Sequence, residues 1–110
     1  MKISNKKMSK SIKIKNDYYL EEYIQFKTLE GINFDDVRKG GKLYKSFIGT
    51  VSHIENGNIV WYYLINIRHR NGIGDGENFG LQLRKPLFSG SNDFQWRFQN
   101  NNSWSNWTLL

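Results

Sequence analysis

The sequence predicts an all-β fold, built as a small antiparallel meander or a sandwich. Three observations support this prediction. Aromatic residues make up 15% of the 110-residue chain, and they fit a pleated, half-buried sheet surface better than a helix. Apolar and polar residues alternate with a period of two over several segments, as they do in strands. Polar turn sequences separate these segments, and ten glycines against a single proline favour many turns.

Charge is distributed unevenly along the chain. Six of its 16 Lys and Arg residues precede the first acidic residue, Asp17, and they account for the whole net charge of +6. They are Lys2, Lys6, Lys7, Lys10, Lys13 and Lys15. We therefore expect residues 1–16 to form a disordered basic arm or a linker, and residues 17–110 to form a single β domain. Such an arm can contact nucleic acid or anionic lipid, but most segments of this kind are solvated linkers.

The segment Asp17–Glu30 has apolar positions that fit neither a helix nor a strand throughout. We expect a short helix or turn at its start, followed by a strand from Tyr23 to Thr28. The next stretch, Gly31–Gly41, contains Asn, Asp and a pair of adjacent glycines. These residue types favour turns, so we expect a turn-rich segment there.

The middle of the chain predicts a β-hairpin. The segment Leu43–Val51 places apolar residues at both parities, which predicts a strand with both faces partly covered. The Asn-Gly pair in Glu55–Asn58 is typical of a type I′ turn. The run Ile59–His69 alternates regularly and predicts a long strand. One face of it carries Trp61, Tyr63, Ile65 and Ile67, and the other carries Tyr62, Leu64, Asn66 and Arg68.

Two further strands and a short final strand are expected after a glycine-rich loop at Asn71–Asn78. The segments Phe79–Arg84 and Phe94–Gln99 both alternate between apolar and polar residues, and Trp104–Leu110 predicts the last strand. Polar turns separate them at Ser89–Asn92 and Asn100–Ser103. Strands at this spacing are typical of a meander or a small sandwich.

Several classes of function are disfavoured by what the chain lacks. It has no cysteines, which excludes disulfides, zinc–thiolate sites, iron–sulfur clusters and cysteine nucleophiles. Neither a Gly-x-Ser-x-Gly nor a His-Glu-x-x-His motif is present, and His53 and His69 stand beside no recognisable catalytic partner. We therefore expect no enzyme activity, no cofactor and no metal. We also expect no membrane span and no secretory signal, because no long apolar run exists and none follows the N-terminal lysines.

The string Arg68–Gly80 is the strongest candidate for a binding site, because it gathers charged and amide side chains around four glycines. These side chains are Arg68, His69, Arg70, Asp75, Glu77 and Asn78. Such a loop could hold calcium, a phosphate, or a sugar or host polymer. The first two are disfavoured because the spacing departs from an EF-hand and no Gly-Lys-Ser/Thr follows. An equal alternative is a structural loop in which Asp75 and Asn78 bond to backbone amides.

The four tryptophans could form a core or a stacking platform for sugars or bases. Trp61 and Trp96 lie on apolar strand faces, so we expect them in the core. Trp104 and Trp107 are three residues apart and cannot share one face of a regular strand. We expect one of them inside and the other at the surface or at a subunit contact.

Two arginines lie at alternating positions in the C-terminal strands. We expect Arg84 and Arg97 to point outward, where they could stack on Trp104 or Trp107. Arg97 and Trp104 are therefore secondary candidates for ligand binding. The alternative is a solvated strand face.

The C-terminal part of the chain has a distinctive composition. It ends in WRFQNNNSWSNWTLL, which combines an aromatic-Arg strand, a polar turn, Trp-Ser-x-Trp and two apolar residues. This ending resembles the knob-like terminal modules of bacteriophage tail fibres, baseplate proteins and pyocin-type tails. The preceding INIRHRNGIGDGENFGLQLRKPL is similar to tail-fibre and minor structural proteins of phages that infect Gram-positive bacteria. The resemblance covers residues 43–110 and implies a β-rich, trimeric tip domain that recognises a cell-surface polysaccharide or teichoic acid.

The resemblance also implies a virion protein of a phage tail or a prophage product. Such a protein is made in the bacterial cytoplasm and leaves the cell by lysis or in an assembled particle. One alternative is a purely structural, trimerising cap of a virion protein. A second is a nucleic-acid-binding domain that uses the lysine arm, which the neutral body disfavours. A third is a carbohydrate-binding module from a larger enzyme.

Overall fold

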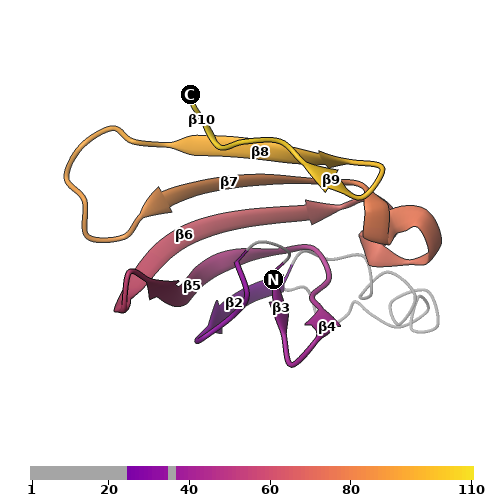
Figure 1. Ribbon diagram of the computed structural model, residues 1–110, viewed down its shortest axis with the longest axis horizontal. Helices are drawn as coiled ribbons and strands as arrows, with labels where there is room; N and C mark the ends of the chain where they lie inside the picture. The colour runs from indigo at the N-terminus through magenta and orange to yellow at the C-terminus, as the bar shows by residue number, and fades with distance from the viewer. Residues whose placement is uncertain (1–24, 35–36) are drawn as a thin grey trace, which may run out of the picture.

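A single curved sheet of seven strands forms the body of the protein in the computed structural model, which describes residues 25–34 and 37–110 (Figure 1). The strands are β2 (Gln25–Leu29), β5 (Phe47–Glu55), β6 (Asn58–Arg68), β7 (Gly80–Pro86), β8 (Gln95–Asn100), β9 (Ser103–Trp104) and β10 (Thr108–Leu109). Their order across the sheet is β10-β8-β7-β6-β5-β2, with β9 paired to one end of β8. The all-β prediction is confirmed.

The smaller elements connect these strands. A separate hairpin of β3 (Arg38–Lys39) and β4 (Lys42–Leu43) lies between β2 and β5 in the sequence. Two 3-10 turns, η1 (His69–Gly72) and η2 (Gly74–Asn78), lie between β6 and β7. Within the described ranges, no helix has the length and apolar character that a membrane crossing requires.

Strands β5 to β8 form the predicted antiparallel meander, whereas β2 runs parallel to β5. Parallel neighbours require a crossover connection, and the segment that holds the β3–β4 hairpin supplies it. The strand expected at Tyr23–Thr28 is found at Gln25–Leu29. The arm expected at residues 1–16, and the helix or turn expected after it, lie outside the described residues.

The turn between β5 and β6 has the predicted geometry. Asn56 and Gly57 both adopt left-handed backbone angles, with φ of 50° and 81°. Two consecutive positive φ angles define a type I′ turn, whose twist matches that of the flanking strands. This turn fixes a nine-residue register from Phe47 opposite Asn66 to Glu55 opposite Asn58.

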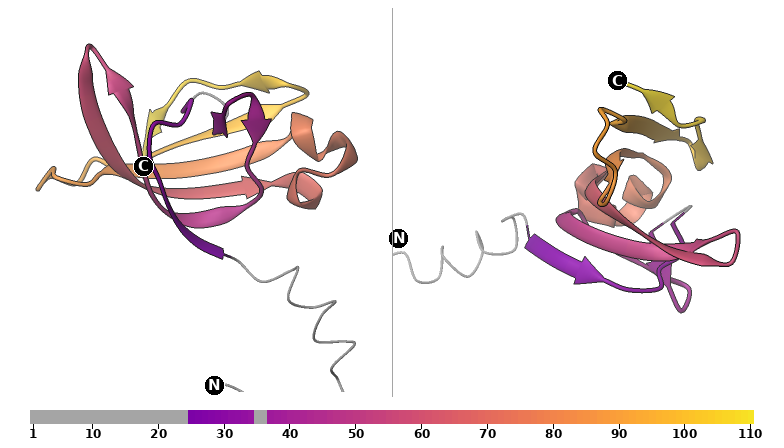
Figure 2. Two further views of the ribbon diagram at one scale, coloured as in Figure 1. Left: turned by 90° about the horizontal axis from the view of Figure 1, so that it is seen from below. Right: turned by 90° about the vertical axis from the view of Figure 1, so that its left-hand side faces the viewer.

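The hydrophobic core lies between one side of the sheet, here called the inner face, and the segment that follows β2. Its buried residues are Ile32, Phe34, Val37, Phe47, Val51, Tyr62 and Leu64. Figure 2 shows the β3–β4 hairpin and the C-terminal segment on this same side of the curved sheet. The core is small, and on the sheet it covers only the part of the inner face formed by β5 and β6.

The rest of the inner face is polar and buried. Asn66, Arg68, Gln82, Arg97 and Gln99 are all 5% exposed or less. Three of them form a chain of hydrogen bonds across β8, β7 and β6: Arg97 Nε donates to Gln82 Oε1 (2.7 Å), and Gln82 Nε2 donates to Asn66 Oδ1 (3.0 Å). Asn66 Nδ2 continues the chain to the carbonyl of Lys45 (3.2 Å). The prediction that Arg97 points outward is therefore wrong.

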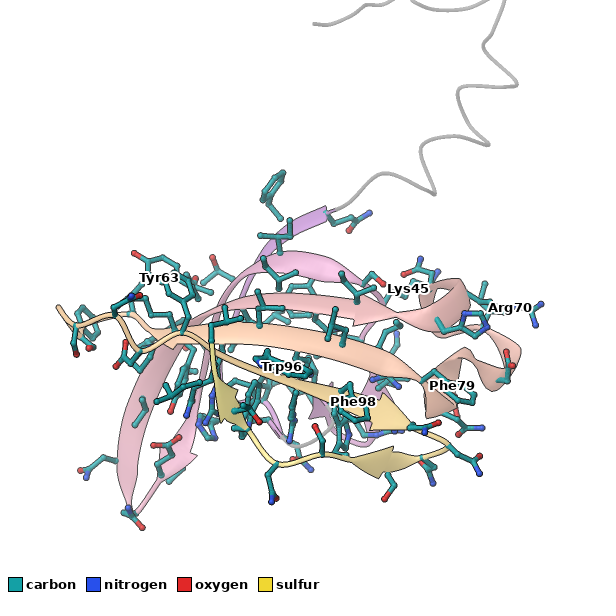
Figure 3. The ribbon with its side chains drawn as sticks, turned by 90° about the horizontal axis from the view of Figure 1, so that it is seen from above. Lys45, Tyr63, Arg70, Phe79, Trp96 and Phe98 are labelled. Atoms are coloured by element: carbon teal, nitrogen blue, oxygen red, sulfur yellow. The ribbon has the colours of Figure 1, made fainter. Side chains whose placement is uncertain are left out.

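The opposite side of the sheet, here called the outer face, is largely apolar, although Thr28, Thr50 and Lys85 also lie on it by strand register. It carries Phe26, Ile48, Tyr63, Ile65, Ile67, Leu81, Leu83, Trp96 and Phe98, which share one side by strand parity and register. Figure 3 shows Tyr63 on β6, with Trp96 and Phe98 on β8. The prediction of a core position is wrong for Trp61 and Trp96, which are only partly buried. The alternation was read correctly, but the apolar face is not the covered one.

Candidate functional site

The loop between β6 and β7 is fastened to the sheet by Arg68. Its side chain is 3% exposed, and Nη2 donates to the Gln99 side chain (2.5 Å) and to the carbonyl of Glu77 (2.7 Å). A third bond from Nη2 reaches the carbonyl of Gly76 (3.4 Å). Arg68 was predicted to bind ligand, but its buried position and these contacts make it the residue that holds the loop in place.

The loop backbone adopts uncommon angles where it leaves β6. Arg70 and Asn71 are both left-handed, with φ of 52° and 54°. Non-glycine residues with such angles cost free energy and persist where surrounding contacts enforce them. Here the Asn71 Oδ1 accepts a hydrogen bond from the backbone N–H of Ser46 (2.8 Å). The loop shape is therefore set by side-chain contacts, as well as by its glycines.

Three of the predicted site residues meet at the tip of the loop. Asp75 Oδ1 lies 3.4 Å from Arg70 Nη1 and 3.6 Å from His69 Nε2. All three side chains are more than half exposed, at 60% for Arg70, 51% for His69 and 54% for Asp75. Ion pairs this exposed contribute little to stability. Their arrangement instead presents two donors and one carboxylate to solvent.

The last two predicted loop residues lie in different surroundings. Glu77 is exposed at the side of the loop that faces the β3–β4 hairpin, while Asn78 is half-buried. The Asn78 carbonyl accepts a hydrogen bond from the backbone of Asn102 (2.9 Å). Asn78 thus ties the loop to the turn between β8 and β9.

A pocket of about 330 Å³ lies between the loop and the β3–β4 hairpin. The hairpin and the residues after it contribute Arg38, Lys42 and Lys45, and the loop contributes Asn71 and Glu77. Figure 3 shows Lys45 at the same end of the sheet as Arg70. Three cations and one carboxylate around a concave surface raise the local concentration of anions. The pocket favours a ligand with negative charge.

The basic side of this pocket was missed in the sequence. Arg38, Lys42 and Lys45 belong to the string VRKGGKLYKS, whose four cations in ten residues are the signal that could have found them. Its first part was interpreted as turn-rich and its last part as the start of a strand, and neither part was assigned a role in binding. Nothing in its spacing reveals that it folds against a loop some 30 residues later, because that contact is tertiary.

The secondary candidates, Arg97 and Trp104, belong to a stack of alternating arginine and aromatic side chains. The Arg97 guanidinium carbon lies 4.2 Å from the ring centre of Trp104 and 4.5 Å from that of Trp107. Arg84 continues the stack, at 3.8 Å from Trp107 and 4.6 Å from Tyr62. Cation–π contacts of this kind fasten the C-terminal segment onto the polar inner face.

This stack corrects one expectation about the tryptophans and one about Arg84. Trp104 and Trp107 both contact Arg97, although residues three apart cannot share a face of a regular strand. The chain leaves strand geometry between β9 and β10, which lets both rings turn to the same side. Arg84 is half-buried within the stack, so its predicted outward position is also wrong.

A second polar cluster lies at the other end of the inner face. Glu55 Oε2 accepts a hydrogen bond from the Tyr62 hydroxyl (2.6 Å) and lies 2.8 Å from His53 Nε2. The hydrogen bond from Tyr62 holds the pKa of Glu55 below its usual range. Burial, followed by that same hydrogen bond, raises the pKa of Tyr62 to about 12. The cluster joins the turn end of the β5–β6 hairpin to the core.

We expect this cluster to make the fold sensitive to alkaline pH. Because the pKa of Tyr62 rises from 10.0 to about 12 on folding, its contribution is complete below pH 10. That contribution is lost as the pH rises from 10 to 12, because Tyr62 ionises at a lower pH in the unfolded chain than in the folded protein. The loss is about 2 kcal/mol, and urea unfolding measured at steps of pH would record it. Tyr62→Phe should flatten this part of the profile, and an unchanged slope in the variant would contradict the assignment.

The chain has no match among models of protein families, curated proteins or solved structures. The part of it that the structure describes also holds no group of three His, Cys, Asp or Glu side chains placed to bind a metal ion. The indications of its function therefore come from its own surface. The strongest site on that surface is the loop tip together with the basic pocket.

Proposed function

We propose that this chain is a non-catalytic binding module of the phage tail-fibre type, which recognises a polymer on the bacterial cell surface. The observation that carries the proposal is the loop tip of His69, Arg70 and Asp75 beside the basic pocket. The tip and the pocket lie at one end of the sheet, and Arg68 fastens the loop to it. Binding sites on loops held by a rigid scaffold are a common arrangement in recognition proteins.

The charge of the site favours an anionic polymer. Arg38, Lys42 and Lys45 line the pocket, and Arg70 extends the positive surface to the loop tip. A teichoic acid carries a phosphate in every repeat, and a row of phosphates can bind cations at several points. A neutral polysaccharide would use the carboxylate of Asp75 to accept hydrogen bonds from hydroxyl groups. Of the two ligands implied by the resemblance, teichoic acid suits these residues better.

The proposed module acts as a homotrimer on a virion. One site of this size offers few contacts, so each copy binds weakly, and three copies on one particle multiply the binding through avidity. A purely structural trimerising cap is the second candidate function. The open outer face of the sheet favours it, because such a surface suits contact between subunits rather than recognition of a hydrophilic polymer.

We expect Arg70→Ala and Lys45→Ala each to lower the affinity for purified wall teichoic acid about tenfold, since each removes a charge-assisted contact of about 1.4 kcal/mol. His69→Ala should lower it less. Binding should weaken as salt is added, because exposed charges are screened. Lys27→Ala, which removes a cation from β2, is the matched control and should bind like wild type.

Asp75→Ala separates the two ligands. With an anionic polymer, its loss keeps or raises the affinity, because a like charge is removed from the site. With a neutral polysaccharide, its loss weakens binding, because an acceptor is removed. If wild type binds neither polymer, or if no variant differs from wild type in binding, the receptor-binding proposal fails and the structural cap remains.

A further inference from the structure

A second pocket, of about 440 Å³, lies where β2 ends beside the β5–β6 hairpin, and the proposed function does not use it. Trp61 and Ile59 on β6, with Ser52 and Ile54 on β5, line one side of it, and it is here called the Trp61 pocket. Register places Ser52 opposite Trp61 and Ile54 opposite Ile59, so these four side chains share one face of the hairpin. The volume falls in the range of small-ligand sites, about 300 to 1,000 Å³.

The segment after β2 forms the wall of the Trp61 pocket, and three hydrogen bonds fasten it. The backbone N–H of Gly31 donates to Ser52 Oγ (3.1 Å), and that of Ile32 donates to the Ser52 carbonyl (3.1 Å). Lys39 Nζ donates to the carbonyl of Glu30 (2.9 Å). The pocket is therefore shaped by tertiary contacts of the fold itself, as most small-ligand sites are.

The floor of the Trp61 pocket combines an aromatic ring with aliphatic side chains. Trp61 is only partly buried, and Ile54 and Ile59 are 62% and 68% exposed. A flat ligand with an apolar face gains free energy on such a floor, because its binding removes apolar area of both partners from water.

The polar groups beside this floor carry no net charge. Glu30 supplies one carboxylate and Lys39 one ammonium group, whereas the basic pocket has three cations and one carboxylate. Ser52 Oγ accepts a hydrogen bond from Gly31 and can still donate its own hydrogen. Donors and acceptors are thus both present, and the balance of charge favours a neutral ligand.

We propose that the Trp61 pocket binds a neutral pyranose sugar, whose ring lies on Trp61. Its hydroxyl groups bond to Ser52, Glu30 and Lys39. A pyranose presents C–H groups on its face and hydroxyl groups around its edge, which matches an apolar floor with polar groups beside it. A nucleobase also stacks on tryptophan, but it lacks the ring of hydroxyl groups that these polar side chains engage.

A neighbouring pocket of about 400 Å³ extends the proposed site. The two pockets share Gly31, His53 and Ile54, and nothing lies within 4 Å of a Cβ added at Gly31. A ligand longer than one sugar can therefore pass from the first pocket into the second. We expect a disaccharide to bind more tightly than a single sugar.

The Trp61 pocket is separate from the loop tip and the basic pocket. Figure 1 shows the turn between β5 and β6 at the opposite end of the sheet from η1 and η2. Lys45 in the basic pocket and Ile54 in the Trp61 pocket are nine positions apart, which corresponds to about 30 Å of extended chain. The inference goes beyond the proposed function, because it adds a ligand of different chemistry at a second place.

The first test follows the indole N–H signals of the full chain by NMR. The chain has four tryptophans, so the signal that Trp61→Phe removes identifies Trp61. The probes are the methyl glycosides of glucose, galactose, N-acetylglucosamine and rhamnose, each at millimolar concentration. At least one of them should shift the Trp61 signal, and a disaccharide of the same sugar should do so at a lower concentration.

Two results of this test overturn the proposal. The first is a Trp61 signal that no sugar shifts, or a sugar that shifts only the signals of Trp104 or Trp107. The second is a shift caused by adenosine and by none of the sugars, which would assign the pocket to a nucleobase.

The second test compares variants by their affinity for the sugar that binds. Trp61→Ala should weaken binding at least about tenfold, because the stacking surface is lost. Tyr63→Ala is the matched control: Tyr63 is 52% exposed on the same face of β6, lies outside the pocket, and should be replaced without effect on binding. Ile59→Ser keeps the ring, should weaken binding by a smaller factor, and decides the matter if circular dichroism shows that Trp61→Ala is unfolded. Equal affinity of the variants at positions 59, 61 and 63 contradicts the proposal.

The outcomes separate this inference from the proposed function. Sugar binding that Lys45→Ala leaves unchanged, in a protein that binds no teichoic acid, supports the Trp61 pocket and counts against the loop site. Teichoic acid binding without any sugar-induced shift at Trp61 supports the loop site and overturns the inference.

Discussion

Arg97→Ala is expected to destabilise the fold by about 3 to 5 kcal/mol. The side chain is 5% exposed, and Nη2 donates to the carbonyl of Phe34 (2.7 Å) while Nε donates to Gln82 (2.7 Å). Alanine would leave both acceptors buried without these donors, at about 1 to 3 kcal/mol each. It would also leave a space between the rings of Trp104 and Trp107, which adds a cavity cost.

The control for this substitution is an arginine outside the stack. Arg70→Ala removes an equal charge from a side chain that is 60% exposed, so its effect should stay within about 0.5 kcal/mol. Arg97→Lys keeps the charge but loses the planar group that lies against both rings, and it should recover little of the loss. Guanidinium unfolding of the four proteins measures these differences. Equal stability of Arg97→Ala and Arg70→Ala would show that the stack does not hold the C-terminal segment.

The same arginine shows where sequence reasoning succeeded and where it failed. Alternation along β8 correctly separated Arg97 from Trp96 and Phe98. Alternation alone does not show which side of a strand is covered. Apolar sides usually face inward, so the side that carries Trp96 was predicted to be the buried one. Here the covering segments pass over the polar side, and contacts such as Arg97 to Phe34 join residues 63 positions apart. No local pattern carries that information.

Local signals were reliable where local chemistry decides the structure. The left-handed angles of Asn56 and Gly57 follow from the turn that their residue types favour. By contrast, the parallel pairing of β2 with β5 depends on where the crossover places β2. The sequence pattern around Phe26 does not indicate in which direction the strand runs relative to β5. The β meander was predictable, whereas its parallel edge was not.

The candidate site was likewise predicted from the sequence only in part. The loop with His69, Arg70 and Asp75 was found from its composition, and the structure brings these side chains together. Arg68 was placed in the same group, although its parity on β6 put it beside Asn66 on what proved to be the inner face. The pocket formed with Lys45 and its neighbours required the tertiary contact.

Gly76→Ala should abolish binding at the loop while leaving the sheet folded. A Cβ at this buried position would lie 1.9 Å from the backbone carbonyl oxygen of His69. That oxygen belongs to the main chain and cannot move aside as a flexible side chain would. Turn η2 must therefore shift away from η1, which separates Asp75 from Arg70 and pulls the Gly76 carbonyl away from Arg68.

The expected cost in stability is about 1 to 3 kcal/mol, as for other overpacked sites, because the crowding is local. The expected loss of affinity is larger than the tenfold of Arg70→Ala, since the tip and the pocket are both displaced. Gly90→Ala is the matched control: nothing lies within 4 Å of its added Cβ, so stability and binding should match wild type. Binding by Gly76→Ala at wild-type strength, with the sheet intact by circular dichroism, would mean that recognition does not use this loop. The ordered display of three side chains at its tip would then have a structural purpose, in line with the cap rather than the receptor-binding module.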